Sequence, residues 1–235
     1  MVLEGGLKMI ETNKIMPNFV ERRSPDHTDG LKRVQVGCGP HNILAEWWNV
    51  DIRAFRGIDQ VMDVTKPWAW EGMLDYIYGE HFIEHLELSG AISFLQNALQ
   101  ALRPGGKIRL STPSLEWVLA THFDLDAEAD DVKIRQTFAT NRAFHGWGHR
   151  FLYSRQFLKK IISSVGFGDV QFFSYGESDD SNLANMERHG GFRVDRGFPS
   201  VWSVEATRLG KCISGDDKFI EKCQSDYMKY VASGH

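Results

Sequence analysis

The sequence predicts an α/β fold built on a mainly parallel sheet of seven strands. Short runs rich in valine, isoleucine and aromatic residues alternate with segments whose apolar residues recur at helical spacing. The first strand-like run leads directly into a glycine-rich turn, and each of the next two runs carries an aspartate near its end. Open parallel sheets bind ligands beyond the carboxyl ends of their strands, so this order also predicts a ligand-binding crevice.

The first five strands follow from short β-rich runs in the amino-terminal half. Residues 33–36 form the first strand and residues 48–52 the second. Only twelve positions separate Gly39 from Asp51, so the helix that usually joins two parallel strands must be reduced to a turn or two, around residues 43–47. The next three strands are expected at residues 61–64, 75–78 and 107–110.

Two helices and two further strands complete the predicted order. Helical spacing of leucine and isoleucine over residues 92–102 ends at Pro104, and a second helical face over residues 151–165 ends at Gly166. The last two strands are expected at residues 170–175 and 200–207.

We expect one main domain, over residues 31–210, after a polar extension of residues 1–30. Residues 114–150 are read as an insertion that covers the site as a lid, and residues 211–235 as a helical tail. The apolar stripe of this tail either packs on its own domain or forms a homodimer contact.

The composition argues against several classes of partner. The net charge of −4 gives no broad basic surface, so we do not expect a nucleic-acid partner. No apolar run approaches the ~18 residues of a membrane span, and no signal-peptide pattern is present. The three cysteines lack CxxC spacing, which favours a reducing compartment. A cytoplasmic location is therefore expected.

The glycine turn and the two aspartates predict a nucleoside pocket. Gly37 and Gly39 let the backbone approach a ligand closely, because a side chain there would clash. Asp51, at the end of the second strand, is placed to accept hydrogen bonds from ribose hydroxyls. Asp63, near the end of the third, could accept one from an adenine amino group.

Two further segments follow in order, DYIYGEHFIEHL at residues 75–86 and LRPGGKIRLSTP at residues 102–113. Together with the glycine turn and the aspartates they resemble class I S-adenosylmethionine-dependent methyltransferases of the type 11 group, over roughly residues 31–210. The resemblance implies a Rossmann-like sheet with helices on both faces and an antiparallel edge strand, contributed by a hairpin of the last two strands. It also implies S-adenosylmethionine as the cofactor.

By this resemblance, the residues after the first four strands hold the methionine, ribose and adenine parts of the cofactor. Two positions depart from the family pattern, since Gln35 replaces its usual acidic residue and His41 its third glycine. We therefore expect a modified methionine end. The expected cofactor-binding residues are Gly37, Cys38, Gly39, Asp51, Ile52, Asp63, Val64, Tyr78, Gly79 and Glu80.

Histidines are the candidate bases. A hydroxyl acceptor needs a proton acceptor, and a neutral imidazole that titrates near pH 7 suits this task. We predict His149 first and His81 second as catalytic residues. The segment HGWGHRFLY can form an acceptor-binding loop, or else an ordinary aromatic loop that leads into the next helix. The expected substrate-binding residues are His145, Trp147, Arg150 and Tyr153.

No metal site is expected from the spacing of the histidines. His81 and His85 share one helical face, but the motif is not HExxH and no third ligand follows nearby. We therefore predict that His85 is a packing residue.

The predicted function is in-line methyl transfer from S-adenosylmethionine to an oxygen or nitrogen of a small-molecule or sugar-like acceptor. One alternative keeps the fold without catalysis, as a cofactor-binding regulatory or scaffold subunit. Another is a nucleotide-sugar or dinucleotide oxidoreductase, against which the incomplete GxGxxG spacing argues.

Overall fold

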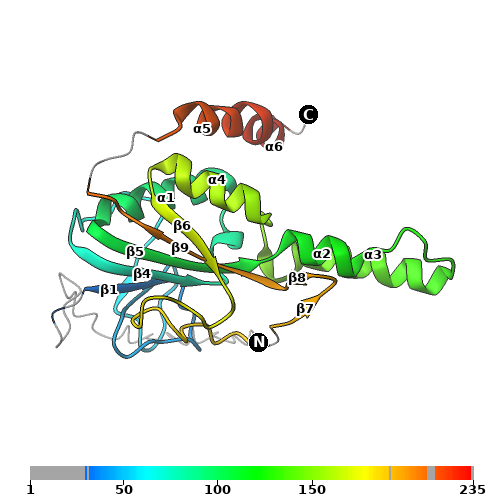
Figure 1. Cartoon of the computed structure of the whole chain (residues 1–235), viewed down its shortest axis with the longest axis horizontal. Coiled ribbons are helices and arrows are strands. Elements are labelled where there is room, and N and C mark those ends of the chain that lie inside the picture. Colours follow the sequence, from blue (N-terminus) through cyan, green and yellow to red (C-terminus); the bar gives the residue numbers. More distant parts are fainter. Residues whose placement is uncertain (1–29, 31, 191, 211–214, 234–235) are drawn as a thin grey trace, which may run out of the picture.

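The structure is a computed structural model that describes residues 30, 32–190, 192–210 and 215–233 (Figure 1). The predicted N-terminal extension, apart from Gly30, lies outside the described residues, as does Cys212. Among the described helices, none combines the length and the apolar character that a membrane span requires.

A seven-stranded sheet forms the centre of the molecule, as the sequence predicted. Its strands are β1 (Arg33–Val36), β2 (Trp48–Asp51), β3 (Gln60–Val61), β4 (Leu74–Glu80), β5 (Leu102–Pro113), β6 (Gly168–Phe173) and β9 (Val201–Thr207). They lie in the order β3-β2-β1-β4-β5-β9-β6, and only β9 is antiparallel to its neighbours. The antiparallel strand thus lies one place in from the edge, beside the edge strand β6. A separate small ribbon consists of β7 (Val194–Asp195) and β8 (Phe198–Pro199).

The helices α1 (Leu88–Ala101) and α4 (Arg155–Val165) pack on the same face of the sheet, above it in Figure 1. Their apolar residues meet alternate strand residues, such as Val34, Ile77 and Ile108, in one continuous core. Loops cover the opposite face, mainly residues 174–190 and the link between β1 and β2. The expectation of helices on both faces is therefore wrong for the part of the chain that the structure describes.

The link between β1 and β2 shows why a helix is missing there. Residues 37–47 form turns, so the helical turn expected around residues 43–47 is absent. The buried side chain of Asn49 pairs with backbone groups of this link instead. Its amide oxygen accepts a hydrogen bond from Leu44 N at 3.0 Å, and its amide nitrogen donates one to Trp47 O at 2.7 Å. A side-chain amide can satisfy loop backbone groups that a helix would pair internally.

A buried ion cluster holds the loop-covered face together. Arg109 on β5 is fully buried, and its guanidinium donates to Glu187 at 2.7 Å and to Glu205 at 2.5 Å. Glu205 lies opposite Arg109 on β9, whereas Glu187 comes from the covering loop. These ion pairs therefore fasten the loop to the sheet.

Further polar contacts hold the same loop nearer its start. Lys107 Nζ lies 3.0 Å from Asp180 Oδ2, and the Tyr76 hydroxyl donates to the same oxygen at 3.2 Å. The Asn182 side chain accepts a hydrogen bond from Arg33 at 3.0 Å. A small apolar cluster fills the space beneath the loop, formed by Leu44, Trp47, Tyr78, Leu183 and Met186.

The predicted insertion, residues 114–150, is a helical arm that projects from the carboxyl end of β5 (Figure 1). It consists mainly of α2 (Leu115–His122) and α3 (Asp130–His145). At its base, Val118 and Ala143 pack with Leu152, whereas Leu125 at the tip is 88% exposed. The base of the arm, rather than its tip, lies against the domain.

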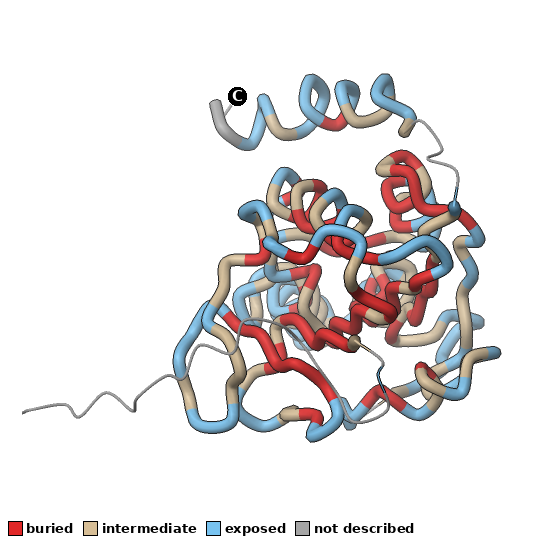
Figure 2. The backbone as a smooth tube through the Cα atoms, turned by 90° about the vertical axis from the view of Figure 1, so that its left-hand side faces the viewer, coloured by how far each residue is buried: buried red, intermediate tan, exposed pale blue. Residues whose placement is uncertain are grey.

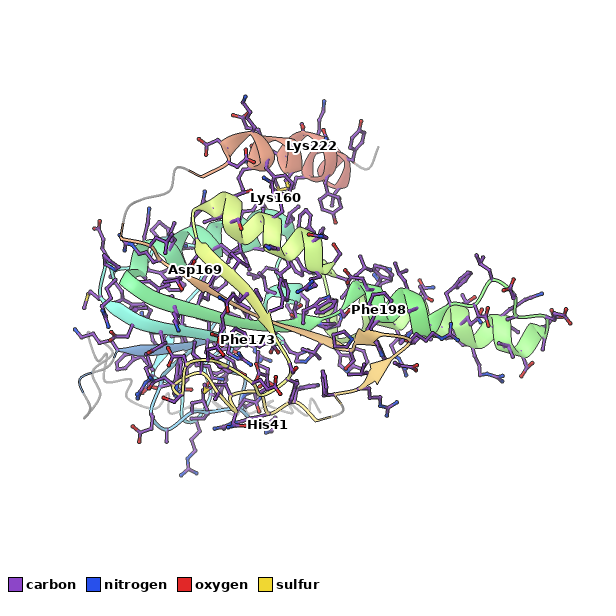
Figure 3. The ribbon with its side chains drawn as sticks, viewed as in Figure 1. His41, Lys160, Asp169, Phe173, Phe198 and Lys222 are labelled. Carbon is purple, nitrogen blue, oxygen red and sulfur yellow. The ribbon has the colours of Figure 1, made fainter. Side chains whose placement is uncertain are left out.

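The C-terminal tail is one continuous helix, made of α5 (Asp217–Cys223), a π-helical turn (Gln224–Met228) and α6 (Lys229–Ser233). It lies over α4, where the rings of Phe219 and Phe157 are 5.9 Å apart and Lys160 lies 2.6 Å from Asp216 (Figure 3). Buried residues gather in the middle of the molecule, whereas this helix is mostly exposed (Figure 2). The tail therefore packs on its own domain, and the homodimer contact stays a prediction.

Substituting Arg109→Met should lower the free energy of unfolding by about 3–5 kcal/mol, because two buried carboxylates lose their partner. Urea unfolding followed by circular dichroism measures this change. The matched control is Arg135→Met, since Arg135 and Asp131 form an exposed ion pair on α3. That control should cost less than about 1 kcal/mol. Equal effects of the two substitutions would show that the buried cluster does not hold the fold.

Candidate active site

The turn after β1 has a backbone conformation that glycine adopts readily. Gly37 and Gly39 have φ angles of +61° and +58°. A Cβ atom on Gly37 would lie 2.2 Å from the Phe82 ring, so lack of space also requires glycine there. Gly39 N donates to Asp51 Oδ2 at 3.0 Å, which ties the turn to the end of β2.

A cavity of about 420 Å³ opens beside this turn, and we call it the acidic cavity. Five of the residues predicted to bind the cofactor line it together: Gly37, Asp51, Ile52, Asp63 and Val64. Asp51 also accepts a hydrogen bond from Arg53 N at 3.0 Å, so each of its oxygens already has one backbone partner. A carboxylate offers about four acceptor sites, so capacity for ligand hydroxyls remains.

Asp63 reaches the acidic cavity from a turn and not from a strand end. The predicted strand over residues 61–64 is placed too late, since β3 ends at Val61. Asp63 Oδ1 accepts hydrogen bonds from the Thr65 hydroxyl at 2.7 Å and from Thr65 N at 3.0 Å. These bonds favour the ionised form and lower the pKa of Asp63. The cavity is therefore bordered by a charged carboxylate at neutral pH.

A second cavity, of about 480 Å³, adjoins the first, and we call it the histidine cavity. It lies between the strand ends, the base of the arm and the segment around residues 189–201. Gly37 and Trp147 line both cavities, which therefore meet. Five histidines contribute to its lining: His81, His85, His122, His149 and His189.

Glu80 lies at the wall of the histidine cavity with one oxygen unpaired. Its Oε1 accepts hydrogen bonds from Arg188 N and His189 N, both at 2.7 Å. Its Oε2 is buried and has no hydrogen-bond partner among the described residues. Cys38 and Gly39 line the same cavity. A buried, half-satisfied carboxylate beside the glycine turn is a ready partner for a cationic group.

Two residues predicted to bind the cofactor line neither cavity. Tyr78 is buried on the loop-covered face, where its ring lies 6.0 Å from that of Trp47, and burial raises the pKa of its hydroxyl. Gly79 serves packing, because a Cβ atom there would lie 3.1 Å from Val36 and 3.2 Å from Leu110. The structure thus gives both residues a role within the sheet.

The two positions that depart from the family pattern also lie outside both cavities. Gln35 is buried on β1, on the face that the loops cover, in register with Tyr78. His41 is exposed, near the lower edge of the molecule in Figure 3. Neither residue therefore contacts the space where the predicted ligand would lie.

His81 and His149 are both held through Nδ1. The Nδ1–H of His81 donates to Glu84 Oε1 at 3.1 Å, and its Nε2 is buried without a partner in the described part of the chain. The Nδ1 of His149 lies 2.8 Å from Ala143 O, and because a carbonyl oxygen only accepts, this nitrogen carries the proton. The Nε2 of His149 is then the nitrogen with the lone pair.

A main-chain contact brings His149 to the end of β4. The carbonyl oxygen of Glu84 accepts hydrogen bonds from Arg150 N at 2.7 Å and from Phe151 N at 3.1 Å. The rings of His85 and His149 consequently lie 5.2 Å apart. Sequence analysis missed Glu84 as a site residue. Its one signal was a carboxylate between the two histidines of the turn that follows β4.

The segment of residues 145–153 contributes fewer residues than predicted. Trp147 is 73% exposed and lines both cavities. His145 is exposed at the end of α3, Arg150 lies 3.7 Å from Glu87, and Tyr153 is fully buried among aromatic rings. The structure does not bring these last three residues into either cavity.

Residues 11–171 match a protein family described as a methyltransferase domain. No curated protein matches the chain. Among solved structures, a SAM-dependent methyltransferase from Archaeoglobus fulgidus is 18% identical with a TM-score of 0.49, over 76% of this chain and 86% of that one. The S-adenosylmethionine-dependent methyltransferase from Mesorhizobium loti is 17% identical with a TM-score of 0.49, over 78% and 93%.

The CurJ carbon methyltransferase is 16% identical with a TM-score of 0.45, over 81% of this chain and 51% of that one. The chain therefore spans about half the length of the CurJ structure that it matches. The family match covers more than half of the present sequence, and it includes the glycine turn and strands β1 to β5. The chain belongs to this family of methyltransferase domains.

Proposed function

We propose that the chain transfers a methyl group to an oxygen or nitrogen atom of a small-molecule or sugar-like acceptor in the histidine cavity. The observation that carries this proposal is the pair of adjoining cavities at the carboxyl ends of the strands. The acidic cavity offers carboxylates for a nucleoside, and the histidine cavity offers bases and aromatic walls. Both volumes suit small ligands.

The residues of the acidic cavity fit the nucleoside part of the cofactor. Asp51 has acceptor sites left for the ribose hydroxyls, and ionised Asp63 can accept from the adenine amino group. Exposed Ile52 and buried Val64 add apolar contact for the base. The glycine turn lets the cofactor approach the backbone between the two cavities.

We assign the ammonium of the cofactor's methionine part to Glu80. The family's usual acidic residue is Gln35 here, and its side chain lies outside the cavities. Glu80 offers an unpaired, buried carboxylate oxygen beside Gly37 and Gly39 instead. An ammonium would supply the charge-assisted hydrogen bond that this oxygen lacks.

S-adenosylmethionine, when bound, supplies an electrophilic methyl group whose bond to sulfur breaks as the bond to the acceptor forms, and the sulfur keeps the electron pair. The chain's residues align the acceptor and receive the proton that it loses. His149 presents Nε2 as the first candidate for this proton, and His81 is the second.

The lining of the histidine cavity narrows the acceptor class. The aromatic side chains Trp117, Trp147 and Phe192 can pack on a sugar or an aromatic ring. Arg142 is the one lysine or arginine that lines this cavity in the part of the chain described. A single cation argues against acceptors with many phosphates, nucleic acids included.

The base of the arm forms part of the acceptor's enclosure. Trp117, His122 and Arg142 line the histidine cavity from α2 and α3, whereas the tip extends away from it. We therefore limit the proposed lid function of residues 114–150 to this base.

Cys38 lies in the glycine turn, where a thiolate would compete with the acceptor for the methyl group. Burial, with the negative charge of Asp51, raises the pKa of Cys38 to about 12. The neutral thiol is a much weaker nucleophile than the thiolate. The turn is thus protected against methylation of its own side chain.

The direct test is release of S-adenosylhomocysteine when the purified chain is incubated with S-adenosylmethionine and pools of sugars, phenols, amines and carboxylic acids. Turnover in one pool, followed by identification of the methylated atom, would support the proposal. Cofactor binding without turnover in any pool would favour a regulatory or scaffold subunit.

Substituting Asp51→Ala should weaken the binding of S-adenosylmethionine at least about tenfold, through loss of charge-assisted hydrogen bonds to the ribose. Isothermal titration calorimetry measures the Kd. Asp131→Ala, on the exposed surface of α3, is the control and should leave the Kd unchanged. An unchanged Kd for the Asp51 variant would mean that the ribose lies elsewhere.

Cys38 should resist alkylation while the chain is folded. At pH 8 its thiolate fraction is about a thousandfold smaller at a pKa of about 12 than at 9. We expect iodoacetamide to label Cys38 at least about tenfold more slowly in native protein than in urea, as followed by peptide mass spectrometry. Equal rates would show that the turn opens readily in solution.

A further inference from the structure

We propose that Glu84, His85 and His149 bind a first-row divalent transition-metal cation at the wall of the histidine cavity. One ligand atom from each residue lies within 4.8 Å of the others. Donors bound to one tetrahedral zinc ion lie about 3.4 Å apart, so the three groups need to close by at most about 1.4 Å.

Main-chain structure brings these residues together. Glu84 and His85 are neighbours in the short 3₁₀ turn (Ile83–His85) that follows β4. The Glu84 carbonyl oxygen accepts from Arg150 N and Phe151 N, which brings His149 to the same place. The third ligand, which the sequence places far from the first two, is therefore held by backbone hydrogen bonds.

The hydrogen-bond partners of His149 and Glu84 are those expected around a metal ion. Histidine ligands usually donate their outer N–H to a carbonyl or carboxylate, which orients the other nitrogen toward the metal. His149 does this through Nδ1 and Ala143 O, at 2.8 Å. The Glu84 carboxylate is oriented similarly, since its Oε2 accepts from the Thr112 hydroxyl at 3.0 Å.

The charge of the cluster also requires compensation. The Glu84 side chain is fully buried, and its hydrogen-bond partners among the described residues are the His81 ring and the Thr112 hydroxyl. Neither is a lysine or arginine. Buried carboxylates are commonly paired with positive charge or coordinate a metal, and the one titratable partner of Glu84 among the described residues is His81, at 3.1 Å. A divalent cation between Glu84 and the two histidines supplies that charge.

The backbone near the cluster is strained in a way that fits a built site. His81 and Trp147 have φ angles of +45° and +56°, which residues with a side chain rarely adopt. Such residues persist where the surrounding structure fixes them, commonly at binding sites. Both residues also line the histidine cavity.

Two histidines and one carboxylate leave coordination positions for an outside ligand. The cavity supplies the space for that ligand, so the cation can hold an oxygen or nitrogen atom of the acceptor. This consequence rests on the proposed function, whereas cation binding does not. With the cation bound, the Nε2 of His149 is a ligand and no longer a proton acceptor.

The test uses the full chain, stripped with EDTA and titrated with Co²⁺ and Zn²⁺. Visible absorption of bound Co²⁺ and elemental analysis of bound Zn²⁺ should show about one equivalent per chain. His85→Gln and His149→Gln should each weaken the affinity at least about a hundredfold. Since His85 is exposed, its variant should fold even if Glu84→Gln does not.

The matched control is His145→Gln, on the exposed end of α3 and outside both cavities, which should bind the cation as the unaltered chain does. Failure of the unaltered chain to bind either ion, or unchanged affinity in the His85 and His149 variants, would overturn the proposal. Methyl transfer by a chain that binds no cation would refute only the metal site. Cation binding without turnover in any acceptor pool would refute only the proposed function.

Discussion

The buried guanidinium of Arg109 is the interaction on which the loop-covered half of the molecule depends. It joins β5, β9 and the covering loop through two carboxylates, in a position where a conventional doubly wound sheet would carry a helix. The same loop continues from Glu187 into Arg188 and His189, whose backbone contacts Glu80. The ion cluster thus indirectly sets one wall of the histidine cavity.

Most of the sheet could be predicted from local patterns. Each of the seven predicted runs overlaps a strand of the sheet, although β3 ends at Val61, the first residue of its predicted run, and is not buried. The covering of the sheet could not be predicted in this way. The covering depends on the polar residues Asn49, Arg109 and Glu187, which bind partners on other segments of the chain. Such pairings cannot be predicted from the local pattern of a single sequence.

The site was predictable where strand ends dictate it. Gly37 and Asp51 meet at one cavity because the parallel strands β1 and β2 end on one side of the sheet, and Asp63 joins them from the turn after β3. The contact between His85 and His149 could not be predicted from the strand ends. His149 reaches His85 only through the backbone bonds to Glu84, so spacing along the sequence gave no sign of a third ligand. Tyr78 and Gly79 line neither cavity, because Tyr78 packs under the covering loop and Gly79 packs within the sheet.

The two oxygens of Glu80 connect parts of the site that are otherwise separate. Oε1 accepts hydrogen bonds from the backbone of residues 188 and 189, and Oε2, which is buried without a partner among the described residues, is the oxygen proposed to bind the cofactor's ammonium. A ligand that pairs with the second oxygen alters the carboxylate that anchors the acceptor's wall. Thermodynamic linkage is reciprocal. If cofactor binding at Glu80 changes the affinity of the site for the acceptor, acceptor binding changes the affinity for the cofactor by the same factor. On the proposed assignment, the two binding affinities are therefore coupled through one side chain.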